Sequence, residues 1–190
     1  ARRALAKRDR VLAAAIRRIG PLQEVAVRWR QPFDTVDVLA RSILHQQLSG
    51  KAAGTIVRRV EAAIGDARLH ADRLSRVDDA SLRACGVSAA KLRALRDLSE
   101  RAEAGEVPSA RALAYMDSEA IVDGLSAVRG IGRWTVQMLL IFRLGRPDVL
   151  PLDDLGIRRG AQWLDAMEVA PDARSLAARA EAWAPWRSLA

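Results

Sequence analysis

The chain has 190 residues, half of them hydrophobic, and carries a formal net charge of +8 from 31 Lys and Arg against 23 Asp and Glu. This length suits one domain, or two small lobes, with a real core, and the positive charge favours a polyanionic partner such as nucleic acid. One cysteine, Cys85, excludes an intrachain disulfide, and the two histidines, His45 and His70, add too few ligands for a zinc or iron–sulfur site.

The N-terminal stretch ARRALAKRDRVLAAAIRRIG alternates charged and apolar residues, which predicts a surface helix over about 4 to 19. This helix could also lie on a membrane surface, but it lacks bulky aromatic anchors. No run of about 18 apolar residues occurs, so we expect no membrane partner and a cytoplasmic, nucleoid-associated protein. Residues 24–33, EVAVRWRQPF, alternate weakly without a partner strand and are interpreted as a connector.

The remaining segments predict helices punctuated by Gly and Pro, so the expected fold class is all-α. The expected helices cover about 36 to 48, 51 to 64, 78 to 84, 88 to 103, 117 to 128, 132 to 144, 153 to 165 and 172 to 182, with another from 185 onward. No methionine opens the chain, and the helix that Pro185 should begin reaches only Ala190. We therefore expect residues to be missing from one or both ends.

Residues 127–140, AVRGIGRWTVQMLL, place two glycines between two amphipathic helices. Gly130 predicts a helix stop in the left-handed conformation, and Gly132 lets the chain enter the next helix at once. The free N–H groups and the positive dipole end of that second helix form an anion site, with Arg129 and Arg133 beside it. The alternative is a tight helix connection that binds no ligand.

Downstream, the segment DVLPLDDLGIRRGAQWL has Pro151 ending one element and Asp153 or Asp154 capping the next helix. An aspartate in this position can simply accept backbone hydrogen bonds. A carboxylate about 20 residues after a two-glycine hairpin, in a basic and helical chain, also fits a catalytic role.

Four segments together resemble the helix-hairpin-helix (HhH-GPD) DNA glycosylases: VRGIGRWT, LPLDDLGIRRG, RSILHQQLSGKAA and WAPWRSLA. The chain is most similar to the DNA-3-methyladenine glycosylase II type, in a compact form without the N-terminal β domain of larger bacterial members. The resemblance runs from about residue 36 to the end. It implies two helical lobes enclosing a DNA-binding cleft: one of residues 36–141, with the helix-hairpin-helix motif at 117–144, and one of residues 1–35 plus 142–190.

The resemblance implies that Asp153 is the essential aspartate of the cleft wall, with Asp154 as the near alternative. Trp134 and Met138 would line the base pocket, where an indole face suits a flat cationic base; core packing is the alternative for both. By alignment Gln47 is the wedge that fills the space of a flipped base, although a solvated helix end explains it equally. The expected DNA-binding residues are Arg129, Gly130, Ile131, Gly132, Arg133, Thr135, Gln46, Gln47, Leu48 and Lys51.

No cofactor is expected for the implied reaction. The resemblance implies only a structural monovalent cation, sodium or potassium, on the backbone carbonyls of Ser126, Val128 and Gly130. The expected partner is duplex DNA containing damaged bases, and the expected state is a monomer.

The resulting prediction is a monofunctional DNA glycosylase that flips out and hydrolyses alkylated bases of the 3-methyladenine or 7-methylguanine type, leaving an abasic site in base excision repair. A non-catalytic helix-hairpin-helix module is one alternative, but it gives no reason for Asp153 and Trp134 together. A bifunctional glycosylase and lyase is another, although Trp134 has no amine to attack the sugar. The four-cysteine cluster of some endonuclease III relatives is absent from the sequence.

Overall fold

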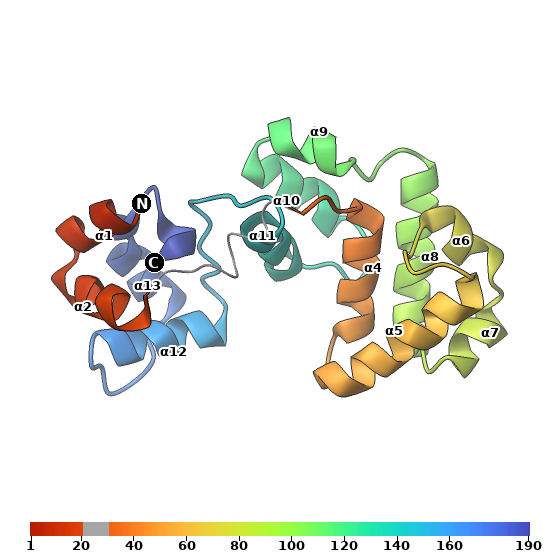
Figure 1. The fold of residues 1–190 in the computed structure, drawn as a ribbon, viewed down its shortest axis with the longest axis horizontal. Coiled ribbons are helices and arrows are strands. Elements are labelled where there is room, and N and C mark those ends of the chain that lie inside the picture. The colour runs from red at the N-terminus through yellow and green to blue at the C-terminus, as the bar shows by residue number, and fades with distance from the viewer. Residues whose placement is uncertain (21–30) are drawn as a thin grey trace. The chain divides into compact units, whose positions relative to one another are not determined.

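A computed structural model describes residues 1–20 and 31–190, and every regular element in these ranges is a helix (Figure 1). This confirms the predicted all-α class. The chain forms two compact units: unit 1 comprises Ala1–Gln31 and Gln137–Ala190, and unit 2 comprises Pro32–Val136. Most of the connector predicted over residues 24–33 lies outside the described residues. None of the described helices is both long and apolar enough to cross a membrane.

Unit 2 is built around α8, which packs against α4, α6 and α7, while α5 also contacts these three helices (Figure 1). Leu39 and Ile43 of α4 and Leu95 and Leu98 of α8 are buried in its core. The helices of this unit are α4 (Thr35–His45), α5 (Gly50–Ile64), α6 (Ala71–Arg76), α7 (Asp79–Ala84), α8 (Ala89–Glu103), α9 (Ala110–Tyr115), α10 (Ser118–Ser126) and the start of α11 (Arg133–Phe142).

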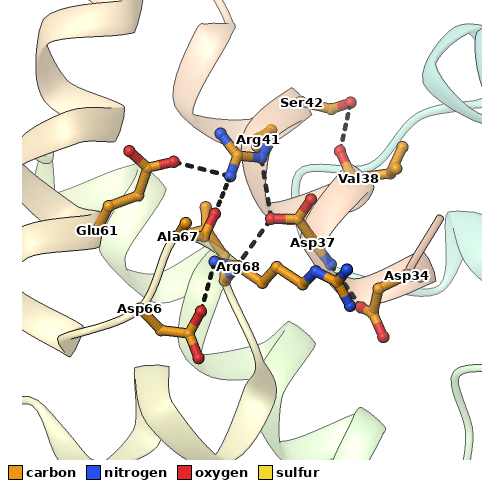
Figure 2. A network of polar contacts seen from close by, with 10 residues as sticks. Asp34, Asp37, Val38, Arg41, Ser42, Glu61, Asp66, Ala67 and Arg68 are labelled. Carbon is orange, nitrogen blue, oxygen red and sulfur yellow. Dashed lines mark hydrogen bonds and ion pairs between the residues drawn. The ribbon is translucent and has the colours of Figure 1, made fainter.

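Arg41 joins three parts of unit 2 (Figure 2). Its guanidinium donates to Asp37 on its own helix at 2.9 Å, to Glu61 of α5 at 2.8 Å and to the Ala67 carbonyl at 2.7 Å. The Asp37 carboxylate also accepts the Leu69 N–H at 2.9 Å. Burial opposes the charge of Arg41, but the hydrogen bonds to Glu61 and Asp37 leave its pKa raised. This network fixes α4 against α5, and α4 leads directly into the turn that contains the predicted wedge.

Unit 1 contains both ends of the chain (Figure 1). Its core consists of Leu5, Leu12, Ala161, Leu176, Ala180 and Trp183. The helices of this unit are α1 (Arg2–Arg8), α2 (Arg10–Ile19), the rest of α11, α12 (Leu155–Leu164), α13 (Ala173–Ala180) and the short 3-10 helices η1 (Glu181–Trp183) and η2 (Arg187–Leu189).

The single helix predicted over about 4 to 19 is wrong, because Asp9 divides it into α1 and α2. Asp9 adopts an extended conformation and caps α2 by accepting the N–H groups of Val11 and Leu12 at 3.0 and 2.9 Å. The other Asp9 oxygen accepts the Trp183 indole N–H at 2.7 Å and pairs with Arg179 at 2.5 Å. One carboxylate therefore breaks the N-terminal helix and ties it to the C-terminal segment.

Two further differences concern short elements. The helix expected from Pro185 onward is instead the 3-10 turn of residues 187–189, which Pro185 precedes without opening it. The six-residue helices α6 and α9 were not predicted. Helices this short show less than two turns of apolar periodicity, so periodicity alone does not reveal them, although α7, of the same length, was predicted.

Candidate functional site

The two-glycine hairpin joins α10 to α11. Gly130 has φ +78, and a Cβ at this position would lie 3.2 Å from the Cβ of Ala94 on α8. Val128 and Ile131, on either side, are buried. The left-handed glycine and the two apolar residues therefore seat the hairpin against the core of unit 2, as the sequence predicts for a helix stop.

Gly132 has a different environment. A Cβ there would meet no atom of the described residues within 4 Å, and the Gly132 carbonyl accepts the N–H groups of Thr135 at 2.9 Å and Val136 at 3.3 Å. The chain thus enters α11 at Gly132, and the first N–H groups of that helix have no partner within it. This end of α11 carries the positive end of the helix dipole.

The two arginines of the hairpin differ in their contacts. The Arg129 backbone N–H donates to Asp97 of α8 at 2.7 Å, and its side chain is exposed. Arg133 forms an ion pair with Glu119 at 2.6 Å, and both side chains are more than half exposed. An exposed pair of this kind contributes little to stability, so the Arg133 guanidinium can exchange Glu119 for a phosphate at small cost.

The carbonyls of the predicted cation site take part in the hairpin contacts. The Val128 carbonyl accepts the Ile131 N–H at 3.0 Å, and the Gly130 carbonyl accepts the Gln46 side-chain amide at 2.7 Å. The hydroxyl of Ser126 is buried and has no hydrogen-bond partner among the described residues. Each carbonyl retains a second lone pair, and the Ser126 hydroxyl adds another oxygen, so these residues fit a weakly held monovalent cation.

The turn after α4 consists of residues 46–48, which we call the wedge turn. Gln47 is exposed and has φ +57, a left-handed conformation that costs a non-glycine residue about 1 kcal/mol or more. Leu48 is 41% exposed, and Lys51 is exposed in the first turn of α5, which Ser49 caps. The side-chain amide of Gln46, which is predicted to contact DNA, donates to the hairpin carbonyl of Gly130 at 2.7 Å.

Trp134 and Met138 lie one helical turn apart on α11 and therefore share a face. Trp134 is 50% exposed and Met138 is half-buried, whereas Val136, Leu139 and Leu140 are buried. The core face of α11 is thus formed by the buried residues, and core packing does not account for Trp134. Trp134 therefore lies at the surface of α11, with half of its side chain exposed.

Asp153 and Asp154 differ in their contacts although they are adjacent. Asp154 caps α12 by accepting the Ile157 N–H at 2.9 Å, and Gly156 leaves room for that carboxylate, because a Cβ there would lie 3.0 Å from the Asp154 oxygen. Asp153 lies in the preceding turn and is exposed, and its carboxylate has no hydrogen bond or ion pair within the described parts of the chain. Asp154 therefore has a structural role, and Asp153 is available for chemistry.

Comparison with known families gives a direct match to the HhH-GPD superfamily base excision DNA repair proteins over residues 40–185. The chain belongs to this superfamily. Among HhH-GPD relatives, DNA-3-methyladenine glycosylase 1 of Schizosaccharomyces pombe is 34% identical over 162 residues, which cover 85% of this chain and 70% of the relative.

Solved HhH-GPD structures agree with this assignment. A DNA-3-methyladenine glycosidase from Bacillus halodurans has a TM-score of 0.87 and 34% identity, covering 98% of this chain and 83% of the other. A 3-methyladenine DNA glycosylase from Schizosaccharomyces pombe, solved in complex with abasic DNA, has a TM-score of 0.81 and 30% identity, covering 98% and 90%. The expected family is therefore confirmed.

Two residues that hold the candidate interface of this HhH-GPD protein in place were not predicted. Asp97 accepts the Arg129 N–H and also pairs with Arg101 at 3.1 Å. Lys91 donates to the Leu44 carbonyl, near the end of α4, at 2.8 Å. Both lie on α8, far along the chain from the backbone groups they contact, so no local sequence pattern could have revealed them.

Proposed function

We propose that this HhH-GPD protein is a DNA-3-methyladenine glycosylase, an N-glycosyl hydrolase that removes alkylated bases from duplex DNA in base excision repair. The sequence similarity to relatives with this name covers most of the chain. The observation that carries the residue assignment is the difference between two neighbours: Asp154 is used as a helix cap, and Asp153 is exposed and uncommitted.

The proposed reaction begins with extrusion of the damaged base, which costs a few kcal/mol and less when pairing is weakened. Gln47, exposed at the tip of the wedge turn, fills the vacated space. Trp134 stacks on the extruded cationic base, with an attraction of roughly 0.5 to 2 kcal/mol. Each step uses a side chain that is exposed in the DNA-free protein.

Bond cleavage follows from the charge of the base. When the glycosidic bond breaks, its electron pair neutralises the cationic base, and positive charge develops on the sugar, as in glycoside cleavage. The Asp153 carboxylate stabilises that charge and orients the water that adds to the sugar carbon and loses a proton. The product is an abasic site in an intact strand, and no cofactor takes part.

Binding to the DNA backbone is assigned to the start of α11 and the wedge turn. The positive dipole end of α11 and the side chains of Arg129, Arg133 and Lys51 provide positive potential without reading bases. We also propose a sodium or potassium ion on the Ser126, Val128 and Gly130 carbonyls as a support of the hairpin. We further propose that the protein acts as a monomer and is cytoplasmic and nucleoid-associated.

The decisive experiment compares Asp153→Asn with Asp154→Asn on alkylated duplex DNA in single turnover, with released bases separated by chromatography. Asp153→Asn should lower base release by about 10²–10³-fold or more, because the charge opposite the sugar is lost, and should keep its affinity for abasic DNA. Asp154→Asn should lower the free energy of unfolding by about 1 kcal/mol or less and change the rate only a few-fold.

The opposite ranking, with Asp154→Asn inactive and Asp153→Asn active, would transfer the catalytic role to Asp154. A wild-type protein that binds duplex DNA but releases no base would support the non-catalytic module instead.

A further inference from the structure

The wedge turn is poorly supported by its own backbone. Its two local hydrogen bonds, from the Gln46 N–H to the Ile43 carbonyl and from the Leu48 N–H to the His45 carbonyl, are both 3.3 Å long. This exceeds the usual range for N–H to oxygen bonds. Gln47 lies between them with φ +57, and this left-handed conformation is unfavourable for a residue with a Cβ. A turn with these properties needs support from elsewhere to keep one conformation.

Lys91 supplies support from α8. Its ammonium donates to the Leu44 carbonyl at 2.8 Å, and Leu44 lies in the last turn of α4, where carbonyls have no partner within the helix. A positive charge at this end also interacts favourably with the helix dipole. Partial burial lowers the pKa of Lys91, because the charged ammonium is less well solvated there than in water. The contact fixes the end of α4 from which the wedge turn departs.

Gln46 supplies support from the hairpin. Its side-chain amide donates to the Gly130 carbonyl at 2.7 Å, across 84 positions of sequence. Gly130 is itself seated on α8 through its close approach to Ala94. The wedge turn is thus connected to the phosphate-binding hairpin on one side and to α8 on the other, all within unit 2.

We propose that Lys91 and Gln46 are positioning residues that hold the wedge turn in its strained conformation, so that Gln47 is presented to the duplex before the base leaves the stack. This inference rests on the proposed function. A preorganised turn has already lost its conformational freedom, so ordering it adds nothing to the cost of base extrusion. A turn that must be ordered during extrusion raises that cost, and the penalty appears only where the base has to be unpaired.

The test uses Lys91→Met, Lys91→Arg and Gln46→Leu, with Lys7→Met on the surface of α1 as the charge-matched control. Single-turnover base release is measured for one alkylated base paired in a duplex and for the same base opposite an abasic-site analogue, where no pairing remains. Lys91→Met and Gln46→Leu should be slower by about tenfold on the paired base, roughly 1.4 kcal/mol, and by much less on the unpaired one. Lys91→Arg keeps a donor and should recover most of the rate.

Amide hydrogen exchange in the DNA-free protein gives a second readout that needs no activity. Residues 46–48 should exchange faster in Lys91→Met and Gln46→Leu than in the wild type, with melting temperatures close to that of the control. Equal slowing on both substrates, or unchanged exchange at the wedge turn, would overturn the positioning role. A wild type that releases neither base would instead contradict the proposed function, and the exchange measurement would still decide the positioning role.

Discussion

Trp134, which we propose as part of the base pocket, cannot supply the nucleophilic amine of a lyase reaction. Its indole nitrogen only donates a hydrogen bond and cannot attack a sugar carbon. Of the three lysines, Lys7 lies in α1 and Lys91 donates to the Leu44 carbonyl, which leaves Lys51 as the exposed amine of unit 2. The residue-level consequence is a reaction in which water is the nucleophile.

Borohydride trapping tests this consequence. The wild-type protein incubated with alkylated duplex DNA and borohydride should give no covalent protein–DNA adduct, since no Schiff base forms. The strands should break only after alkali or heat is added. An efficient adduct would refute the monofunctional mechanism, and its loss in Lys51→Met would identify the nucleophile.

At the scale of elements, the two hairpin glycines have different functions. Gly130→Ala should lower the free energy of unfolding by about 1 to 2 kcal/mol, because its φ of +78 is left-handed and Ala94 is 3.2 Å away. Gly132→Ala is the matched control, since a Cβ there meets no atom within 4 Å in the parts of the chain that the structure describes. Its stability should change by less than about 0.5 kcal/mol.

For DNA affinity we expect the opposite order, with Gly132→Ala affected more than Gly130→Ala. If a phosphate approaches the start of α11, the Gly132→Ala methyl group occupies part of that approach and should weaken duplex binding. Wild-type affinity should also fall steeply with salt and vary little with flanking sequence, which titrations at several salt concentrations would measure. A salt-independent Kd would contradict phosphate binding by this hairpin.

Most elements with two or more turns, and the shorter α7, could be predicted from the sequence, whereas α6, α9 and the tertiary contacts could not. Apolar periodicity and capping residues revealed α5, α8 and the helices of the hairpin to within a few residues. Asp9 was missed because its role depends on Trp183, 174 positions away. In the candidate site, Gly130 and the Asp153–Asp154 pair were visible as local motifs. The contacts of Gln46 and Lys91 depend on how the helices pack.

At the scale of the whole molecule, the contacts of Asp9 with Arg179 and Trp183 join the N-terminal helices of unit 1 to its C-terminal segment. Burial tends to raise the pKa of Asp9, but hydrogen bonds from the Leu12 N–H, Trp183 and Arg179 lower it below its ordinary value of 3.8. A carboxylate whose folded pKa is lowered stabilises the protein above that ordinary value. Its contribution is lost as pH falls through the folded pKa.

Asp9→Asn should therefore destabilise the protein by about 2 kcal/mol near neutral pH, with a smaller difference from the wild type below pH of about 4. Thermal unfolding measured across this pH range would show the two melting temperatures converging in acid. Asp153→Asn is the control, because its exposed carboxylate has no partner in the described residues and its melting temperature should follow the wild type at every pH. A constant difference between Asp9→Asn and the wild type would contradict the assignment.

The contact between Asp9 and Trp183 also has a consequence for synthesis on the ribosome. Residues 32–136 form unit 2 as one continuous stretch, so this unit can fold as soon as that stretch has emerged. The helices α1 and α2 emerge earlier, but the partners of Asp9, Trp183 and Arg179, are translated only near the end. At roughly 5–20 residues per second, Trp183 is added about 8 to 33 s after the end of α2, so the first helices wait that long for their core, while the unit that carries the hairpin and the wedge turn is already complete.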